Sequence, residues 1–462
     1  MPLPLLAEGA SRGLSGIPYG YTALKTAAGL IAVTALKRYF GGARNVADRV
    51  MHSKVVMVTG GTSGIGAAVV KDLATRGAQV ILLTQHSPSD PFIVDYIEDL
   101  RTSTGNELIY AEQVDLASLY SIRLFATKWI DNSPVRRLDM VVLCANTQKP
   151  SSSRASYGTS EGLQEEWQIN YLANYHLLSI LSPALRAQPP DRDVRIIFTT
   201  CSSYIGANKL DLKILEKATV AQPPSKSSTG AAANKKIKNG PEALVTSSSM
   251  YATSKLALMI FARSFQQHLT YTPRTDKQNN PLPPPPARVL VVDPGFCRTP
   301  GTRRWLSGGS LWGLLFYLIT WPVWWLVLKS SDQGAQSILM AAMEANFSGV
   351  GITAVISLDE VKNMAGENSD MTGRKKVGIE GGTLLKECKE RQILRSEIMD
   401  EKVGKELWEF SQRQIEHKEK EAALLRAMEK KAKAEEEKGK EKEKKSPSSK
   451  ENEKPAEAKK KK

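Results

Sequence analysis

The chain has 462 residues, 41% of them hydrophobic, and a formal net charge of +15. Its length suffices for one large α/β domain with accessory segments or for two ordinary domains. Residues 411–462 hold 18 Lys and Arg against 12 Asp and Glu, so this tail supplies +6 of the charge. Because no basic helix is interleaved with aromatic residues and no zinc-finger spacing occurs, the sequence does not indicate a nucleic-acid partner.

Residues 1–50 form a first segment that is poor in acidic residues. Its apolar stretch, Thr22–Phe40, is interrupted by Lys25, and the uninterrupted part, Thr26–Leu36, is shorter than the ~20 residues that span a bilayer. Three interpretations stay open: a helix on a membrane surface, a mitochondrial-type presequence, or a helix packed on the domain that follows.

Short apolar runs alternate with helix-length segments from Lys54 onward. The runs are rich in β-branched residues and nearly continuous in hydrophobicity, which is typical of strands buried on both faces of a parallel sheet. They are VVMVTG, QVILLT, LDMVVLCA, VRIIFTT and ARVLVVDPG. The alternation predicts an α/β fold, a Rossmann-type doubly wound parallel sheet, over residues 51–380.

Two inserts and a charged end interrupt this pattern. Residues 204–249 are polar and rich in small residues, which predicts an inserted surface loop, and PLPPPP at Pro281–Pro286 predicts a stiff extended connector. Residues 381–432 are charged and helical in pattern. Residues 433–462 are rich in Lys and Glu and bury too little apolar surface to fold, so we predict a disordered tail.

The four cysteines lie far apart and form no CxxC pair; they are Cys144, Cys201, Cys297 and Cys388. This spacing suits a reducing compartment and offers no disulfide framework. We therefore expect no metal site.

A glycine-rich sequence, TGGTSGIG at Thr59–Gly66, follows the first predicted strand and precedes a helix. Glycines at such a turn let the backbone approach a pyrophosphate, which then binds to the amide groups of the helix N-terminus. The strand-turn-helix context therefore indicates a nucleotide-binding turn.

A second motif, YATSK, places Tyr251 and Lys255 on one face of a helix. A nearby ammonium can depress the pKa of the phenol, so that the tyrosine exchanges a proton with a carbonyl or hydroxyl group. The pair is a candidate acid/base site.

Together the two motifs resemble those of the short-chain dehydrogenase/reductase family over about Lys54–Ala345. In that family TGxxxGxG binds NAD(P), and the Tyr and Lys form the catalytic core. Asp115 resembles the aspartate that contacts the adenine, Asn170 resembles the helix asparagine behind a proton-relay water, and PGFCRT at Pro294–Thr299 resembles the loop beside the nicotinamide. DLASLYSIRLFA and SSDQGAQSILMA look most like the retinol-dehydrogenase-like, membrane-associated branch.

The chain departs from the family pattern in two places: the strand that lines the cofactor, and the length of the loop before Tyr251. Leu143, Cys144, Ala145 and Asn146 replace the usual NNAG. The gap before Tyr251 is also much longer than in the family, which costs little because closure entropy grows only logarithmically with loop length.

The position of the catalytic serine is ambiguous. The pattern SSxxG in TTCSSYIG puts Ser202 and Ser203 on the family's serine pair, and Ser203 would then hydrogen-bond the substrate oxygen. Counting from the start of the strand at Arg195 puts Cys201 there instead. We prefer Ser203 and leave Ser202 and Cys201 open.

The resemblance implies roles for a set of residues. Tyr251 would be the general acid/base, Lys255 would lower its pKa and hold the nicotinamide ribose, and Asn170 would hold the relay. The cofactor-binding residues would be Gly60, Thr62, Ser63, Gly64, Ile65, Gly66, Gln85, Asp115, Leu116, Ala145, Tyr251, Lys255, Pro294, Gly295 and Thr299.

The second predicted strand ends in QVILLTQHSPSD, with Gln85 and His86 where an acid would bind the ribose of NAD or an arginine the 2′-phosphate of NADP. Without an acid, NADP is not repelled. We therefore predict NADP, with NAD left open.

An uncharged run, WGLLFYLITWPVWWLVL, follows the PG loop, where the family builds its substrate-covering helices. Residues 305–329 hold five of the eight tryptophans, and tryptophan favours the membrane-water interface. Pro322 would kink a spanning helix. We predict that this segment closes the substrate pocket and dips into a lipid leaflet, with a spanning helix and a soluble cap as alternatives.

The sequence thus predicts an oxidoreductase that transfers a hydride between NADP(H) and a lipophilic alcohol or carbonyl compound, of retinoid, steroid or lipid-like class. We expect it on the membrane of the endoplasmic reticulum or a lipid droplet, facing the cytosol, with the mitochondrial surface as an alternative. The other interpretation is a degenerate family member that binds nucleotide as a membrane-anchored scaffold and recruits a protein partner through its charged C-terminal helix.

Overall fold

The computed structural model describes residues 19–132, 136–149, 158–189, 192–219, 247–271, 274–275, 281–282, 286–347 and 382–445. Most of the predicted loop at 204–249, part of the proline-rich connector and the end of the predicted tail lie outside these residues. The chain divides into two units, Met1–Gln412 and Arg413–Lys462. The sheet and the candidate site belong to the first.

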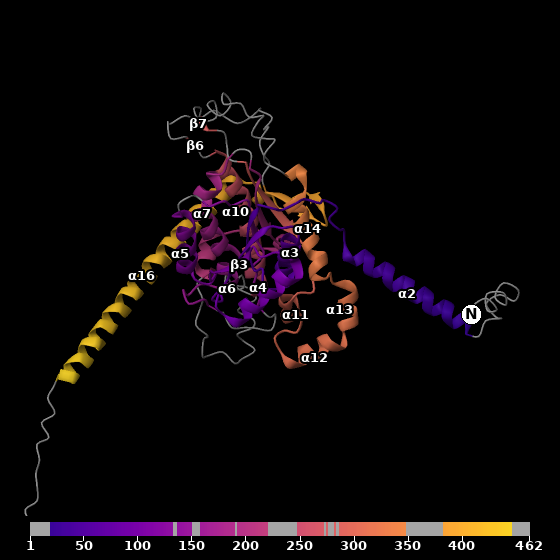
Figure 1. Ribbon diagram of the computed structural model, residues 1–462, viewed down its shortest axis with the longest axis horizontal. Helices are drawn as coiled ribbons and strands as arrows, with labels where there is room; N and C mark the ends of the chain where they lie inside the picture. The colour runs from indigo at the N-terminus through magenta and orange to yellow at the C-terminus, as the bar shows by residue number, and fades with distance from the viewer. Residues whose placement is uncertain are drawn as a thin grey trace, which may run out of the picture. The chain divides into compact units, whose positions relative to one another are not determined.

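An eight-stranded sheet in the order β10-β9-β8-β5-β4-β1-β2-β3 forms the centre of this unit (Figure 1). All neighbouring strands are parallel except β10, which pairs antiparallel with β9. The strands are β1 Val55–Thr59, β2 Gln79–Thr84, β3 Ile109–Gln113, β4 Met140–Leu143, β5 Val194–Thr199, β8 Ala287–Asp293, β9 Thr383–Lys386 and β10 Lys389–Arg391. The predicted doubly wound α/β sheet is confirmed.

The five predicted strands occupy the middle of the sheet, where almost every residue is buried. Three outer strands of the sheet were missed: β3 and β10 at its two edges, and β9 next to β10. In β3, IYAEQ, buried and partly exposed residues alternate, and β9 contributes only the pair Leu384 and Leu385 to the buried interior. The sheet therefore extends past residue 380, the predicted end of the domain.

Helices cover both faces of the sheet. α3 (Gly64–Thr75) packs against α4 (Pro91–Thr104) and α14 (Ser331–Met343), whereas α7 (Ala173–Arg186) packs against α5 (Leu119–Ile130) and α10 (Ser247–Tyr271). The shorter helices are α6 Glu165–Trp167, α8 Leu212–Thr219 and α11 Pro300–Leu306, with 3-10 turns at Ser202–Gly206, Ala345–Phe347 and Ser396–Ile398. A two-stranded hairpin joins β6 (Arg274–Thr275) and β7 (Pro281–Leu282).

The long helix α16 (Glu401–Lys445) begins inside the first unit. Its Trp408 ring lies 5.2 Å from the Tyr175 ring, and the Ser411 hydroxyl lies 2.6 Å from the Tyr171 hydroxyl. The segment predicted as a charged helical region from residue 381 therefore starts with two strands of the sheet and a helical turn packed on the core.

The apolar run forms two helices, α12 (Leu311–Ile319) and α13 (Trp321–Val327). The break lies at Thr320, and Pro322 occupies the first turn of α13, where its missing N–H costs no hydrogen bond. The N-terminal helix α2 (Gly20–Gly41) contacts α13. Within the described part of the chain, no helix combines the length and the apolar character that a bilayer span requires.

Candidate active site

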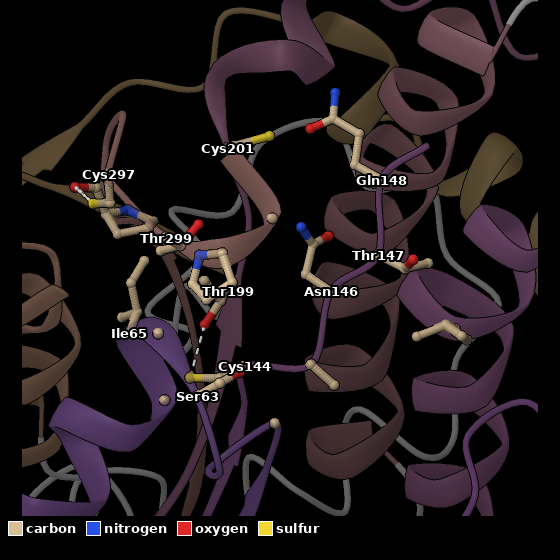
Figure 2. Close-up of a pocket in the computed structure, with 18 of the residues that line it drawn as sticks. Ser63, Ile65, Cys144, Asn146, Thr147, Gln148, Thr199, Cys201, Cys297 and Thr299 are labelled. Atoms are coloured by element: carbon tan, nitrogen blue, oxygen red, sulfur yellow. Dashed lines mark hydrogen bonds between the residues drawn. The ribbon is translucent and has the colours of Figure 1, made fainter. Parts of the chain in front are cut away.

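A cavity of about 760 Å³ opens at the carboxyl ends of the parallel strands. All residues predicted to bind the cofactor line it, together with Cys201, Ser202 and Ser203. In Figure 2, Ser63 and Ile65 at the start of α3 lie on one side of the cavity, and Asn146 and Gln148 lie on the other. Asn170 is not among the lining residues.

The turn from β1 into α3 has no room for a side chain at Gly60 or at Gly66. A Cβ on Gly66 would lie 2.2 Å from the Gly60 carbonyl oxygen, and one on Gly60, whose φ is 66°, would lie 2.7 Å from the Ala145 Cα. Ser63 precedes α3 and makes no capping hydrogen bond with its side chain. The first residues of α3 therefore line the cavity without a side-chain cap on their amide groups.

Tyr251 and Lys255 lie one turn apart on α10, and both are buried. The Tyr251 hydroxyl oxygen accepts hydrogen bonds from Asn146 Nδ2 at 3.2 Å and from Cys201 Sγ at 3.4 Å. Lys255 Nζ donates to the Thr199 carbonyl at 3.2 Å and lies 5.9 Å from the centre of the Tyr251 ring.

Burial controls the pKa values of this pair. It raises the pKa of Tyr251 well above its ordinary value. It also lowers the pKa of Lys255. The lowering of the Tyr251 pKa that the sequence led us to expect is therefore not found in the protein without ligands, because desolvation of a phenolate outweighs its stabilisation by nearby donors.

The three candidates for the serine position differ in what they contact. Cys201 Sγ is the atom beside the Tyr251 hydroxyl, and the Ser203 hydroxyl lies 2.8 Å from Cys201 Sγ. Ser202 points elsewhere: its hydroxyl donates to Asp293 at 2.5 Å and accepts from Lys386 Nζ at 2.7 Å. The geometry thus favours Cys201 over our preferred Ser203.

Asn170 lies in a π-helical turn, Gln168–Leu172, between α6 and α7. Its side chain accepts from the Thr147 amide at 2.8 Å and donates to the Thr147 carbonyl at 2.9 Å and to the Ser254 hydroxyl at 3.3 Å. It therefore holds the segment after β4 against α10, and these hydrogen bonds reach neither Tyr251 nor Lys255.

Among the cavity residues that had no predicted role, Asn146 and Lys386 make polar contacts at the site. Asn146 was noted only as a departure from NNAG, yet its side chain reaches Tyr251. Lys386, at the end of β9, pairs with Asp293 at 3.2 Å. No signal in the sequence could have found Lys386, because it lies beyond the predicted domain and is brought in by an edge strand.

Comparison with known proteins agrees with this geometry. A family model described as short chain dehydrogenase matches residues 54–211. The uncharacterized oxidoreductase pbr1 of Schizosaccharomyces pombe is 40% identical over 351 residues, which cover 76% of this chain and 86% of that protein. The chain belongs to the short-chain dehydrogenase/reductase family.

Other members of the family are also similar. The uncharacterized oxidoreductase YNL181W of Saccharomyces cerevisiae is 32% identical over 92% of this chain and 95% of its own length. Human retinol dehydrogenase 13 is 28% identical over 68% of this chain and 79% of its own length. This short-chain dehydrogenase/reductase is therefore an oxidoreductase of the retinol-dehydrogenase-like branch, as the motifs predicted.

The cofactor of the family, NAD(P), fits the side chains present. The closely packed turn around Gly60 and Gly66 and the uncapped start of α3 suit a pyrophosphate, which this short-chain dehydrogenase/reductase would hold there. At the end of β2, Gln85 and His86 line the cavity, and none of its described lining residues is an arginine. When bound, the nicotinamide supplies or accepts the hydride.

Proposed function

We propose that this enzyme interconverts a lipophilic alcohol and its carbonyl compound with NADP(H) at a membrane surface, with retinoids, steroids or lipid-like compounds as the substrate class. The observation that carries the proposal is the Tyr251 hydroxyl: it lines the cavity, and its oxygen already accepts two hydrogen bonds. The Tyr251 O–H can therefore donate its proton in a hydrogen bond to a substrate oxygen.

Each residue of the site has a role in this proposal. Tyr251 gives a proton to the substrate oxygen or takes one from it. Lys255, with its ammonium beside the Tyr251 ring, stabilises the phenolate and holds the nicotinamide ribose. Cys201 stands at the position expected for the serine and donates its thiol proton to the Tyr251 oxygen, and Asn170 keeps the segment after β4 in place.

An apolar substrate is favoured by the mouth of the cavity. Phe296 and Trp305 line it and meet edge to face at 6.2 Å. Trp305 belongs to α11, which contacts α12. A lipophilic molecule entering between these rings would leave water before it reached Tyr251.

The membrane proposal rests on α12 and α13. Leu311, Trp312 and Phe316 are 85%, 82% and 62% exposed, an unusual exposure for such large apolar side chains. No acidic residue occurs between Asp293 and Asp332, whereas Arg303 and Arg304 lie in the adjoining α11. Apolar helices flanked by basic groups suit an anionic lipid surface, such as that of the endoplasmic reticulum or a lipid droplet.

NADP is favoured over NAD by the end of β2. The side chains there, Gln85 and His86, carry no carboxylate that would repel a 2′-phosphate. Competition between the two cofactors in a fluorescence binding assay would measure the preference. Tighter binding of NADH than of NADPH would contradict it.

Turnover of NADPH with a panel of retinal, steroid ketones and long-chain aldehydes tests the catalytic proposal. Tyr251→Phe should lower kcat by about 100- to 10,000-fold, the range for loss of a general acid. Tyr271→Phe, at the exposed end of the same helix, is the matched control. If wild type bound NADPH without turning over any carbonyl, the nucleotide-binding scaffold would be the better proposal.

A further inference from the structure

Two hydrogen-bond donors meet at the Tyr251 hydroxyl oxygen. Asn146 Nδ2 lies at 3.2 Å and Cys201 Sγ at 3.4 Å. They come from the ends of two neighbouring parallel strands: Asn146 follows β4, and Cys201 follows β5. Both line the cavity in Figure 2.

The direction of the Tyr251 O–H follows from these bonds. A phenol oxygen has two acceptor lone pairs and one proton. Because the Cys201 thiol and the Asn146 amide occupy the acceptor positions, the Tyr251 proton is free to point into the cavity. The Cys201 thiol proton points at the Tyr251 oxygen. The Ser203 hydroxyl, 2.8 Å from Cys201 Sγ, can then donate a hydrogen bond to that sulfur.

We propose that Asn146 is a positioning residue of the reaction: its amide directs the Tyr251 O–H toward the substrate and stabilises the phenolate that proton transfer leaves behind. This inference rests on the proposed function. In the reductive direction the carbonyl carbon has received the hydride, and its oxygen takes the proton of Tyr251. The O–H bond breaks, and its electron pair stays on Oη, where the Asn146 N–H donates to it.

The other groups around Tyr251 act in different directions on its pKa. Burial and the carboxyl of Glu166 raise it, whereas the hydrogen bond from Asn146 lowers it. Lys255 contributes an ammonium beside the ring. The Asn146 amide and the Lys255 ammonium therefore both favour the phenolate form of Tyr251, whereas burial and the Glu166 carboxyl favour the neutral phenol.

Two variants test the role of Asn146. Asn146→Asp keeps the shape but replaces the donor with an acceptor, and Asn146→Gly removes the side chain. In both, the pH dependence of kcat assigned to Tyr251 should move to higher pH by about one unit, and kcat for reduction at neutral pH should fall about tenfold. The affinity for NADPH should change little, because Asn146 acts through the tyrosine.

A spectroscopic titration of Tyr251 gives a second readout that needs no turnover. The phenolate absorbance of each variant bound to NADPH is compared with that of the same variant carrying Tyr251→Phe. Asn132→Asp, at the end of α5 and outside the cavity, makes the same chemical change as a control and should titrate like wild type.

The outcomes separate the two proposals. Folded, active variants that keep the wild-type pH profile and titration would overturn the role of Asn146. If wild type catalysed no reduction, the proposed function would fail, while the titration would still show whether Asn146 stabilises the Tyr251 phenolate. A shift in both readouts for Asn146→Asp and Asn146→Gly supports the inference.

Discussion

Cys201 lies beside the Tyr251 hydroxyl, where its thiol is a weaker hydrogen-bond donor than a serine hydroxyl would be. We predict that Cys201→Ser keeps or increases kcat because an O–H donates more strongly than a thiol to the Tyr251 oxygen. Cys201→Ala should lower kcat about tenfold, which corresponds to loss of one hydrogen bond. Steady-state kinetics with NADPH and the best carbonyl substrate would measure both.

Cys388→Ser makes the same change at a cysteine outside the cavity and should leave kcat at the wild-type value. Full activity of Cys201→Ala would contradict a role for the thiol. In that case Ser203 would have to be tested as the group that orients the substrate oxygen.

Glu166 is buried behind the site, and one of its carboxyl oxygens accepts from the Lys149 amide at 2.9 Å. Burial raises its pKa from 4.5 to about 7. The folded protein therefore holds the proton of the Glu166 carboxyl more tightly than the unfolded chain does. The protonated carboxyl stabilises the folded state below pH 4.5, and this contribution is lost as the pH rises through about 7.

The free energy of unfolding should therefore fall between these pH values, by up to about 3 kcal/mol from this group. Glu166→Gln should remove that part of the slope, as measured by urea denaturation across the range. Glu165 is the neighbouring half-buried carboxyl, and Glu165→Gln should keep the pH-dependent slope. An unchanged slope in Glu166→Gln would mean that other groups cause the pH dependence.

At the scale of elements, the turn between β1 and α3 brings the backbone of Gly66 close to that of Gly60. We predict that Gly66→Ala weakens NADPH binding at least about tenfold and destabilises the fold by about 1–3 kcal/mol, because its Cβ would lie 2.2 Å from the Gly60 oxygen. Gly29→Ala in α2 meets no atom within 4 Å and is the control. Undiminished thermal stabilisation of Gly66→Ala by NADPH would contradict this prediction.

Helices α12 and α13 should provide the contact with lipid. Replacing Trp312 and Phe316 by serine removes two exposed aromatic side chains from α12 and should reduce binding to anionic vesicles by tenfold or more, since burying one such side chain contributes about 1.5–3 kcal/mol. Leu108→Ser removes an exposed apolar side chain elsewhere and serves as the control. Equal flotation of all three proteins with vesicles would exclude this surface.

At the scale of the whole molecule, the C-terminal part of the first unit completes the sheet and the core. Leu385 is fully buried in β9, and Phe410 of α16 lies 6.4 Å from the Trp167 ring. We predict that a chain ending at residue 380 fails to fold, whereas a chain ending at Gln412 keeps the thermal stability and NADPH binding of the full chain.

Soluble yield, circular dichroism and thermal unfolding of the two truncated proteins would test this. A stable, nucleotide-binding protein ending at residue 380 would mean that the edge strands and the start of α16 are dispensable. Phe410→Ala in the full chain gives an independent measure and should lower stability by about 3–5 kcal/mol.

Much of the fold could be predicted because buried parallel strands leave a strong local pattern. The runs VVMVT and QVILLT are apolar throughout, and they became β1 and β2. Strand β3 has partly exposed polar residues, and β9 is four residues long, so neither differs enough in sequence from a loop or a helix end. Edge strands need tertiary contacts to be distinguished.

The sequence by itself determined the family motifs, because a glycine turn and a Tyr-Lys pair depend on spacing within one helix or turn. It could not decide the position of the serine, because Cys201 has an extended backbone whereas Ser202 and Ser203 lie in a 3-10 turn, and this change of conformation after β5 sets where each side chain points. Tertiary structure decided that Cys201 faces Tyr251 while Ser202 turns to Asp293 and Lys386. It also brought Asn146 and Lys386 to the cavity, because β4 and β9, which are distant in the chain, end at the same edge of the sheet.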